Sequence, residues 1–203
     1  MEADPHSRFP MMGEVTFDIR PLALSDWPVL ETLFGGNGAC GGCWCMYWRV
    51  PSTGQYWQDH KGEPNRRAFE ALVRTGAAMG MLAFAEGEPA GWLSLGWKEE
   101  FAYLQRSPRL SGDTGNTMSV TCFFIPAAWR GRGLATALLT RAIDHARRLG
   151  AGYLEGYPSI PRSNARIPPA FAHTGVPEMF EAAGFERWRE AGGRAIYRVS
   201  LSQ

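Results

Sequence analysis

The stretch CFFIPAAWRGRGLATALLTRA, residues 122–142, decides the fold of this chain. An apolar run is followed by the hinge RGRG at 130–133, and the apolar positions after the hinge have helical spacing. A strand that enters a helix through such a hinge leaves backbone N–H groups unpaired at the helix N-terminus. The helix dipole adds partial positive charge there, so the hinge favours an anion.

The residue types in the hinge fit a phosphate group. Gly131 and Gly133 let the backbone approach an anion without a Cβ in the way. Arg130 and Arg132 can add charge-assisted hydrogen bonds at the rim. A P-loop would need Gly-Lys-Ser/Thr, and a dinucleotide fingerprint would need a third glycine where Thr136 stands. The alternative is a solvated arginine-rich turn, which the strand–helix context disfavours.

The elements around the hinge predict a mixed sheet. A buried strand at 118–125, a helix at 131–149 and a strand at 152–158 form a unit that requires parallel strands and a right-handed crossover. The fold class is therefore α/β (α+β), with a mostly antiparallel sheet flanked by helices. We expect residues 1–14 to be a flexible tail and residues 15–203 to form one domain. The other predicted elements are strands at 15–22, 77–85, 88–97, 185–190 and 194–200, helices at 25–34, 65–76 and 177–184, and irregular segments at 35–62 and 98–117.

Composition excludes several classes of protein. With 45% hydrophobic and 12% aromatic residues among 203, the chain can bury a sizeable core. The formal net charge is +1, from 21 basic and 20 acidic side chains, so no global field attracts nucleic acid or anionic lipid. No apolar run is long enough to cross a bilayer, and the polar, proline-interrupted start does not resemble a secretory signal. We expect a cytoplasmic protein with no nucleic-acid or membrane partner.

Three of the four cysteines crowd into CGGCWC, at Cys40, Cys43 and Cys45. A cytoplasmic chain of this size needs no disulfide framework, so we expect reduced thiols. A structural zinc would need a fourth ligand, for which His60 is the nearest candidate, and usually a second cysteine pair. We therefore predict no metal and interpret Cys122 as a core residue.

Three segments resemble one family. RGRGLA at 130–135 resembles the Arg/Gln-x-x-Gly-x-Gly/Ala signature of the GNAT superfamily of N-acetyltransferases, and it lies where that family has it, between the fourth strand and the third helix. MFEAAGFERW at 179–188 resembles the closing helix–turn–strand of the family, and DIRPLALSDWPVL its opening. The resemblance covers about residues 15–200. GACGGCWCMYWR and SVTCFFIPAAWRGRGLA together resemble one subgroup of the family, and this resemblance does not indicate the acceptor.

The resemblance implies transfer of an acetyl group from acetyl-CoA to a primary amine of a small molecule or peptide. It places the cofactor diphosphate on the amides of the hinge and the pantetheine arm along the fourth strand, in a splay between the fourth and fifth strands. The edge strands typical of this fold are compatible with a homodimer. A CoA-binding protein without efficient catalysis is the alternative function. The implied cofactor-binding residues are Phe123, Phe124, Ile125, Arg130, Gly131, Arg132, Gly133, Leu134, Ala135 and Thr136.

The chemistry needs a group that accepts a proton from the amine. An alkyl ammonium has a pKa of about 10, so a general base must deprotonate it at neutral pH. Many relatives carry an acid on the fourth strand, but SVTCFFI has none. On the next strand Tyr153, Glu155 and Tyr157 share one face. Glu155 is the candidate base, and a salt-bridged or solvated strand end is the alternative.

The family's usual general acid is a tyrosine at the position of Phe180, which has no hydroxyl. Tyr157 or His173 can replace it, or no acid is needed, because a thiol with a pKa near 8.5 leaves moderately well. His173 stands where relatives often have an asparagine that bonds the pantetheine. It could serve the cofactor, relay a proton or be a surface residue.

The aromatic segment after the first helix lies beside the acceptor mouth according to the resemblance. Trp44, Tyr47 and Trp48 are the candidate substrate-binding residues, because an aromatic wall holds apolar or cationic groups. The alternative is a secondary core under a long loop.

Overall fold

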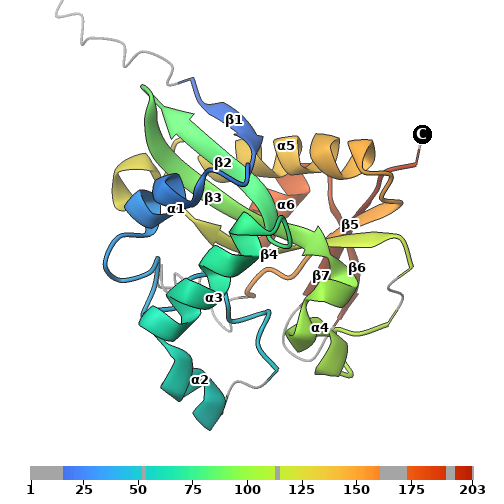
Figure 1. Cartoon of the computed structure of the whole chain (residues 1–203). Helices are drawn as coiled ribbons and strands as arrows, with labels where there is room; N and C mark the ends of the chain where they lie inside the picture. The colour runs from blue at the N-terminus through green and yellow to red at the C-terminus, as the bar shows by residue number, and fades with distance from the viewer. Residues whose placement is uncertain (1–15, 52–53, 113–114, 161–172, 191–194, 203) are drawn as a thin grey trace, which may run out of the picture.

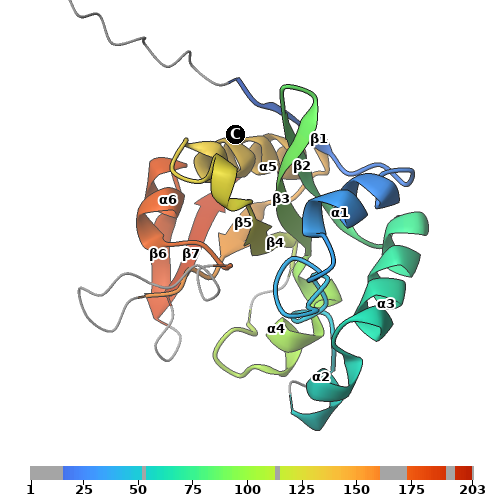
Figure 2. The same ribbon diagram turned by 90° about the vertical axis from the view of Figure 1, so that its left-hand side faces the viewer.

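A computed structural model describes residues 16–51, 54–112, 115–160, 173–190 and 195–202. Seven strands form one sheet in the order β1-β2-β3-β4-β5-β7-β6, and helices cover both of its faces (Figures 1 and 2). The predicted tail at 1–14 lies outside the described residues. The elements are β1 (Asp18–Pro21), α1 (Trp27–Phe34), α2 (Gln55–His60), α3 (Glu63–Arg74), β2 (Met79–Ala85), β3 (Glu88–Trp97), η1 (Lys98–Glu100), α4 (Ala102–Arg106), β4 (Thr117–Phe124), η2 (Ala127–Trp129), α5 (Leu134–Arg148), β5 (Tyr153–Gly156), α6 (Pro177–Ala182), β6 (Glu186–Glu190) and β7 (Ala195–Ser200).

The predicted crossover is present, and it leaves a gap in the sheet. β4 and β5 run parallel and pair from Thr117 opposite Tyr153 to Val120 opposite Gly156. β4 continues to Phe124, but beyond Val120 it pairs only with β3, where the register shifts between Ser94 and Leu95. The two central strands therefore diverge at their carboxyl ends, which confirms the predicted splay. All other strand pairs are antiparallel.

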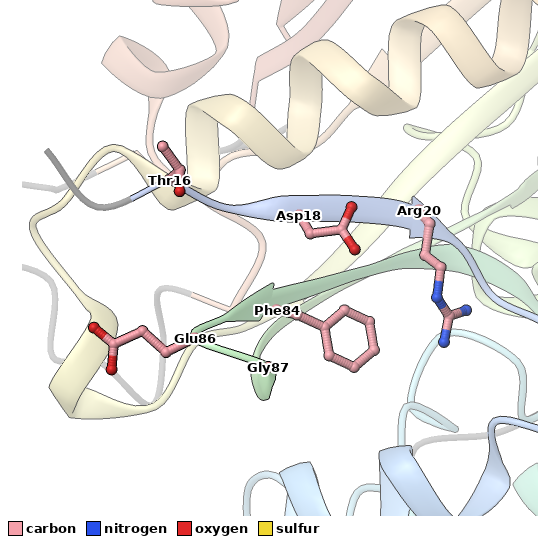
Figure 3. Close-up of a pocket in the computed structure, with 6 residues that line it drawn as sticks. All are labelled: Thr16, Asp18, Arg20, Phe84, Glu86 and Gly87. Carbon is pink, nitrogen blue, oxygen red and sulfur yellow. The ribbon is translucent and has the colours of Figure 1, made fainter.

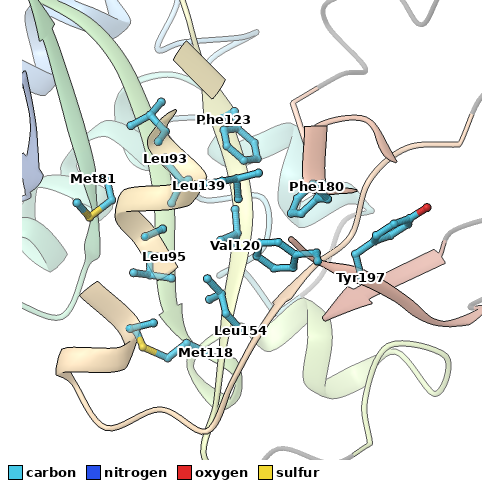
Figure 4. Close-up of a cluster of buried hydrophobic side chains, with 14 of the residues drawn as sticks. Met81, Leu93, Leu95, Met118, Val120, Phe123, Leu139, Leu154, Phe180 and Tyr197 are labelled. Carbon is cyan, nitrogen blue, oxygen red and sulfur yellow. The ribbon is translucent and has the colours of Figure 1, made fainter. Parts of the chain in front are cut away.

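The two faces of the sheet carry different helices. α5 packs on one face through Leu134, Leu138 and Leu139, which meet strand residues such as Leu93 and Val120 (Figure 4). α1 and α3 pack on the other face around Trp27, Phe34, Phe69 and Trp92. A third, smaller cluster contains Trp48, Phe101 and Tyr157. Because side chains alternate along a strand, each strand contributes to both faces.

The amphipathic pattern of residues 131–149 forms α5, but the helix starts later than predicted. It begins at Leu134 because Gly131 and Gly133 have positive φ angles of 72° and 77°, which no α-helix contains. Gly133 is the N-cap residue in a left-handed conformation, a region that glycine enters without steric cost.

Two segments predicted as irregular contain short helices. α2 lies within 35–62, and η1 and α4 lie within 98–117. α3 starts at Glu63 instead of residue 65, because Pro64 is favourable in the first turn of a helix. Helices this short are stabilised by their tertiary packing. They contain too few residues to show a repeating pattern of apolar positions, so the sequence alone did not predict them.

Candidate functional site

The start of α5 presents a row of unpaired amides. Among the described residues, no protein acceptor takes a hydrogen bond from the backbone N–H groups of residues 131–136, and the first such bond in the helix joins Ala137 N–H to the Gly133 carbonyl at 3.0 Å. Gly131 and Gly133 are exposed, and a Cβ built on either would meet no atom within 4 Å. The hinge is therefore open to solvent and not blocked by side chains.

The two arginines of the hinge strengthen its positive field. Arg130 and Arg132 are solvent-accessible, and the first turn of α5 carries no acidic residue. The Arg130 side chain donates from Nε to the Ile125 carbonyl at 2.7 Å, and the Arg132 guanidinium lies 5.2 Å from the Trp129 ring centroid. Both cations stay beside the unpaired amides, an arrangement that binds phosphate groups. Ala135 and Thr136 follow in the first turn, while the Leu134 side chain packs into the core.

The open edge of β4 is bridged by the chain that leads into α6. Phe123 N–H donates to the His173 carbonyl at 2.6 Å, and Ser159 N–H donates to the Gly175 carbonyl at 3.1 Å. Residues 173–175 thus lie between β4 and the chain that follows β5. Two of the backbone groups expected to pair with pantetheine, Phe123 N–H and the Ile125 carbonyl, have protein partners in this structure. The Phe124 side chain packs on the other face, against Phe34.

Four of the predicted catalytic and substrate residues form one connected aromatic group. The Tyr47 ring lies 6.2 Å from the His173 ring and 6.0 Å from Trp48, and Trp48 stacks on Tyr157 at 5.7 Å. Through the His173 carbonyl this group is joined to the open edge of β4. Residues far apart in the sequence therefore meet beside the splay.

Glu155 lies at the inner end of this group and is completely buried. Its Oε1 accepts hydrogen bonds from Arg198 Nε and Nη2 at 3.0 and 2.6 Å. Its Oε2 accepts from Tyr157 at 2.9 Å and lies 2.9 Å from Lys98 Nζ, which is also buried. Four donors fill the acceptor positions of the carboxylate. This geometry favours the salt-bridged interpretation of Glu155 over direct contact with an amine.

A chain of hydroxyls leads from Glu155 towards β4. The Tyr157 hydroxyl lies 2.8 Å from Ser119 Oγ. Since the single phenolic proton is donated to Glu155, Ser119 is the donor to Tyr157. Burial, with the neighbouring Glu155 charge, raises the pKa of Tyr157 well above its ordinary value, so the phenol stays protonated.

Comparison of the sequence with known protein families identifies the family to which this chain belongs. The sequence model of the Acetyltransferase (GNAT) family matches residues 45–160, which is more than half of the 203-residue chain. This chain belongs to the GNAT acetyltransferase family. No curated protein sequence matches the chain significantly.

Solved structures share the fold of this GNAT protein at low sequence identity. An N-acetyltransferase from Staphylococcus aureus Mu50 is 16% identical, with a TM-score of 0.53, over 92% of this chain and 99% of the other. The PaiA N-acetyltransferase from Thermoplasma acidophilum, in complex with coenzyme A, is 15% identical, with a TM-score of 0.52, over 91% and 99%. A GNAT superfamily phosphinothricin acetyltransferase from Sinorhizobium meliloti, in complex with AcCoA, is 16% identical, with a TM-score of 0.55, over 92% and 89%.

Three residues that the sequence singled out lie in the core of this GNAT domain. Trp44 packs between Trp27 and Phe34 and is 5% exposed, so the structure favours the secondary core for this residue. Trp48 is 1% exposed and packs in the cluster with Phe101 and Tyr157, so its ring is also buried in this structure. Phe180 is fully buried, and its ring occupies the space where a Cβ on Gly156 would stand. An aromatic ring in this position is a packing element of the splay.

The cysteines and His60 do not form a metal centre in the described part of the chain, which contains no group of three or more His, Cys, Asp or Glu side chains arranged to hold a metal. The four thiols are free. His60 stacks on Tyr56, and its Nδ1 lies 2.7 Å from the Tyr56 carbonyl oxygen. Cys122 is buried, as predicted. Within the described residues, no helix combines the length and the apolar character that a membrane span requires.

A shallow depression lies along β1 and the β2–β3 turn (Figure 3). Its cation, Arg20, donates to both carboxylate oxygens of Asp26, at 2.6 and 2.8 Å, and stands over the Phe84 ring. The charge of Arg20 is therefore compensated within the protein, and we assign this depression no role.

Sequence reasoning missed three residues of the buried network: Lys98, Ser119 and Arg198. Arg198 and Ile196 are two residues apart along β7, so both side chains lie on the same face of the sheet as Glu155 and Tyr157. Lys98 is the first residue of η1, directly after the end of β3 and two residues beyond Gly96. Strand alternation could have suggested the shared face, but only the order of the strands brings Lys98 to Glu155.

Proposed function

We propose that this protein binds acetyl-CoA and transfers its acetyl group to a primary amine of a small molecule or peptide. The observation that carries the proposal is the row of unpaired N–H groups at residues 131–136, flanked by two arginines and opening beside the splay. Membership of the GNAT family and the coenzyme A complexes of structural neighbours support it. We also propose a cytoplasmic location for the protein.

The hinge would hold the diphosphate of the cofactor through its amides and through Arg130 and Arg132. Pairing of β4 with the pantetheine arm requires one exchange of hydrogen bonds, because Phe123 N–H must leave the His173 carbonyl. The Ile125 carbonyl can keep the Arg130 side chain and accept a second hydrogen bond through its other lone pair. The Phe123 amide is thus occupied by the protein's own backbone until the cofactor replaces this bond.

We assign proton removal from the amine to His173. Its side chain is half-buried, its ring faces Tyr47, and its carbonyl touches the edge of β4 where the splay opens. Imidazole is the side chain whose ordinary pKa lies nearest to neutral pH. Glu155, with its two cations, would hold Tyr157 and Ser119 in place as a positioning residue.

Acetyl-CoA supplies the acetyl group as a thioester. His173 takes one proton from the ammonium, and the neutral amine forms the new C–N bond while the C–S bond breaks. The nitrogen loses its second proton as the amide forms, and the CoA thiolate takes up a proton from the nitrogen, from solvent or from protonated His173, so that one proton is released overall. Thiol pKa values near 8.5 make this departure feasible without a tyrosine at position 180. Phe180 is therefore compatible with turnover.

Binding is tested by calorimetry with CoA on a matched pair of variants. Gly133→Ala and Gly150→Ala change glycines at the two ends of α5 that have φ of 77° and 81°, and neither added Cβ meets a protein atom within 4 Å. Both variants carry the same backbone strain of about 1–2 kcal/mol. Only the methyl at 133 would meet a bound diphosphate, so we expect Gly133→Ala to weaken CoA binding at least about tenfold, or 1.4 kcal/mol, and Gly150→Ala to leave it unchanged. Absence of binding heat in the parent protein, or equal affinities of the two variants, would refute the cradle.

The proton route is tested by kinetics against a panel of primary amines. If His173 is the base, His173→Gln lowers kcat about 10²- to 10⁴-fold and removes the corresponding limb of the pH profile. Ser119→Ala then has a small effect. The reverse result, a large loss in Ser119→Ala and Tyr157→Phe with His173→Gln active, would assign the base to Glu155 through the hydroxyl chain. A parent protein that binds CoA but acetylates no amine would favour the alternative of a binding protein.

A further inference from the structure

Arg49 carries a guanidinium edge without a partner. Its Nε and Nη2 atoms are buried, and in the described part of the chain neither has a hydrogen-bond partner. No described carboxylate lies within 4 Å of the Arg49 guanidinium. A buried cation that lacks its hydrogen bonds is costly, so a group that occupies this edge is expected.

The surroundings of Arg49 place this edge next to the buried end of the aromatic group of Tyr47, Trp48, Tyr157 and His173. The guanidinium lies 4.6 Å from the Phe101 ring centroid, and Phe101 belongs to the cluster that contains Trp48 and Tyr157. Trp48 precedes Arg49 and stacks on Tyr157, which holds Ser119 and Glu155. The cation therefore stands beside the aromatic group that runs to His173.

At two other arginines of this chain, the guanidinium edge formed by Nε and Nη2 donates hydrogen bonds to a carboxylate. Arg198 donates from Nε and Nη2 to Glu155, and Arg66 donates from Nε and Nη2 to Glu31. The parallel N–H groups on this side of a guanidinium match the oxygens of a carboxylate. Arg49 offers the same two atoms, but no described carboxylate, including nearby Glu100, accepts a hydrogen bond from them.

The cofactor phosphates do not fit this position. The phosphate-binding hinge belongs to α5, which packs on one face of the sheet, whereas the neighbours of Arg49 in the sequence, Trp48 and Val50, lie in the clusters without α5. Burial lowers the pKa of Arg49, and the charge of Glu100 on η1 partly offsets this effect. Glu100 forms no ion pair with Arg49 within 4 Å in the described residues, so the Nε and Nη2 atoms themselves still lack an acceptor. The acceptor substrate is the molecule that can bring a carboxylate to this edge.

We propose that Arg49 binds a carboxylate of the acceptor, so that the preferred substrates are primary amines that also carry a carboxylate. This inference rests on the proposed acetyltransferase function. Because Nε and Nη2 are not accessible to solvent in this structure, the side chains around them must move apart when the acceptor enters. In this arrangement Arg49 selects the acceptor by its charge.

The test compares acceptors that are matched in length, one ending in a carboxylate and the other in a carboxamide. We expect the parent protein to favour the carboxylate partner at least about tenfold in kcat/KM for its best chain length, since a buried charge left unpaired is penalised. Arg49→Gln should reduce this ratio to about one, mainly by lowering kcat/KM for the carboxylate, with CoA affinity unchanged. Arg49→Lys should keep part of the preference, because it retains the charge but not the fork.

Arg106→Gln is the control. Its guanidinium lies 4.8 Å from the Tyr103 ring centroid in the same region, but it has a partner, the Val50 carbonyl, at 2.8 Å. This variant should keep the carboxylate preference. Equal kcat/KM for the two acceptors in the parent protein, with acetyl transfer and CoA binding intact, would overturn the role of Arg49 and leave the acetyltransferase function standing. Absence of CoA binding or of transfer to every amine would overturn the proposed function itself. If Arg49→Gln does not fold, the ratio in the parent protein and in Arg49→Lys decides.

Discussion

The buried cluster around Glu155 makes an asymmetric prediction about stability. One carboxylate lies between two cations, Lys98 and Arg198, whose side chains are 0% and 10% exposed. Glu155→Gln removes the carboxylate that both cations contact and leaves two positive charges facing each other in the interior. Breaking a buried ion pair in this way costs about 3–5 kcal/mol, which lowers the melting temperature of a chain of this size by about 6–20 °C.

Lys98→Met should cost less, although Lys98 is fully buried. The Glu155–Arg198 pair stays neutral and methionine fills a similar volume, so we expect the lost charge-assisted hydrogen bond to Glu155 to cost about 1.5–3 kcal/mol. The double variant Glu155→Gln/Lys98→Met keeps a single cation, so it should be more stable than Glu155→Gln alone.

Urea unfolding at pH 7, followed by circular dichroism, measures all four proteins. The reasoning about uncompensated charge is wrong if Lys98→Met is as destabilised as Glu155→Gln. It is equally wrong if the double variant is less stable than Glu155→Gln, because removal of the repelling cation should raise the free energy of unfolding. Kinetic assays of Glu155→Gln need a temperature below its lowered melting point to separate folding from catalysis.

Three further predictions concern other parts of the fold. The hydrogen-bonded ion pair with Arg20 on β1 lowers the pKa of Asp26 in the folded protein. The stabilisation from this pair is therefore present above the ordinary carboxyl pKa of about 4 and is lost as the pH falls through the pKa of Asp26 in the folded protein. The difference in unfolding free energy between the parent and Asp26→Asn should shrink when unfolding is repeated from pH 7 down to pH 3, and a constant difference would contradict this. Burial raises the pKa of Cys43 to about 12, so iodoacetamide at pH 8 should label the exposed Cys40 first in intact-protein mass spectra, and rapid labelling of Cys43 would contradict the structure. Gly156→Ala would place a Cβ 2.0 Å from the Phe180 ring, which should destabilise the protein by about 3 kcal/mol, and a melting point within about 2 °C of the parent would show that the ring can move.

The sequence predicted the central strand–helix–strand unit and the open glycine hinge before α5 because both depend on local chemistry. The apolar run of β4, the glycines of the hinge and the spacing of apolar residues in α5 act over a few residues each. Alternation along β5 correctly put Glu155 and Tyr157 on one face, and the free amides of residues 131–136 follow from any helix that begins after such a hinge.

Only the tertiary structure decided what those residues contact. Lys98 and Arg198 reach Glu155 because β3, β4, β5 and β7 stand side by side, and that order is not written in any local pattern. The same holds for Tyr47 against His173 and for the unpartnered edge of Arg49, since each depends on segments distant in the chain. A residue's type and spacing determine which chemistry it can perform, whereas burial and partners determine whether its charge is free for a ligand or used to hold the fold.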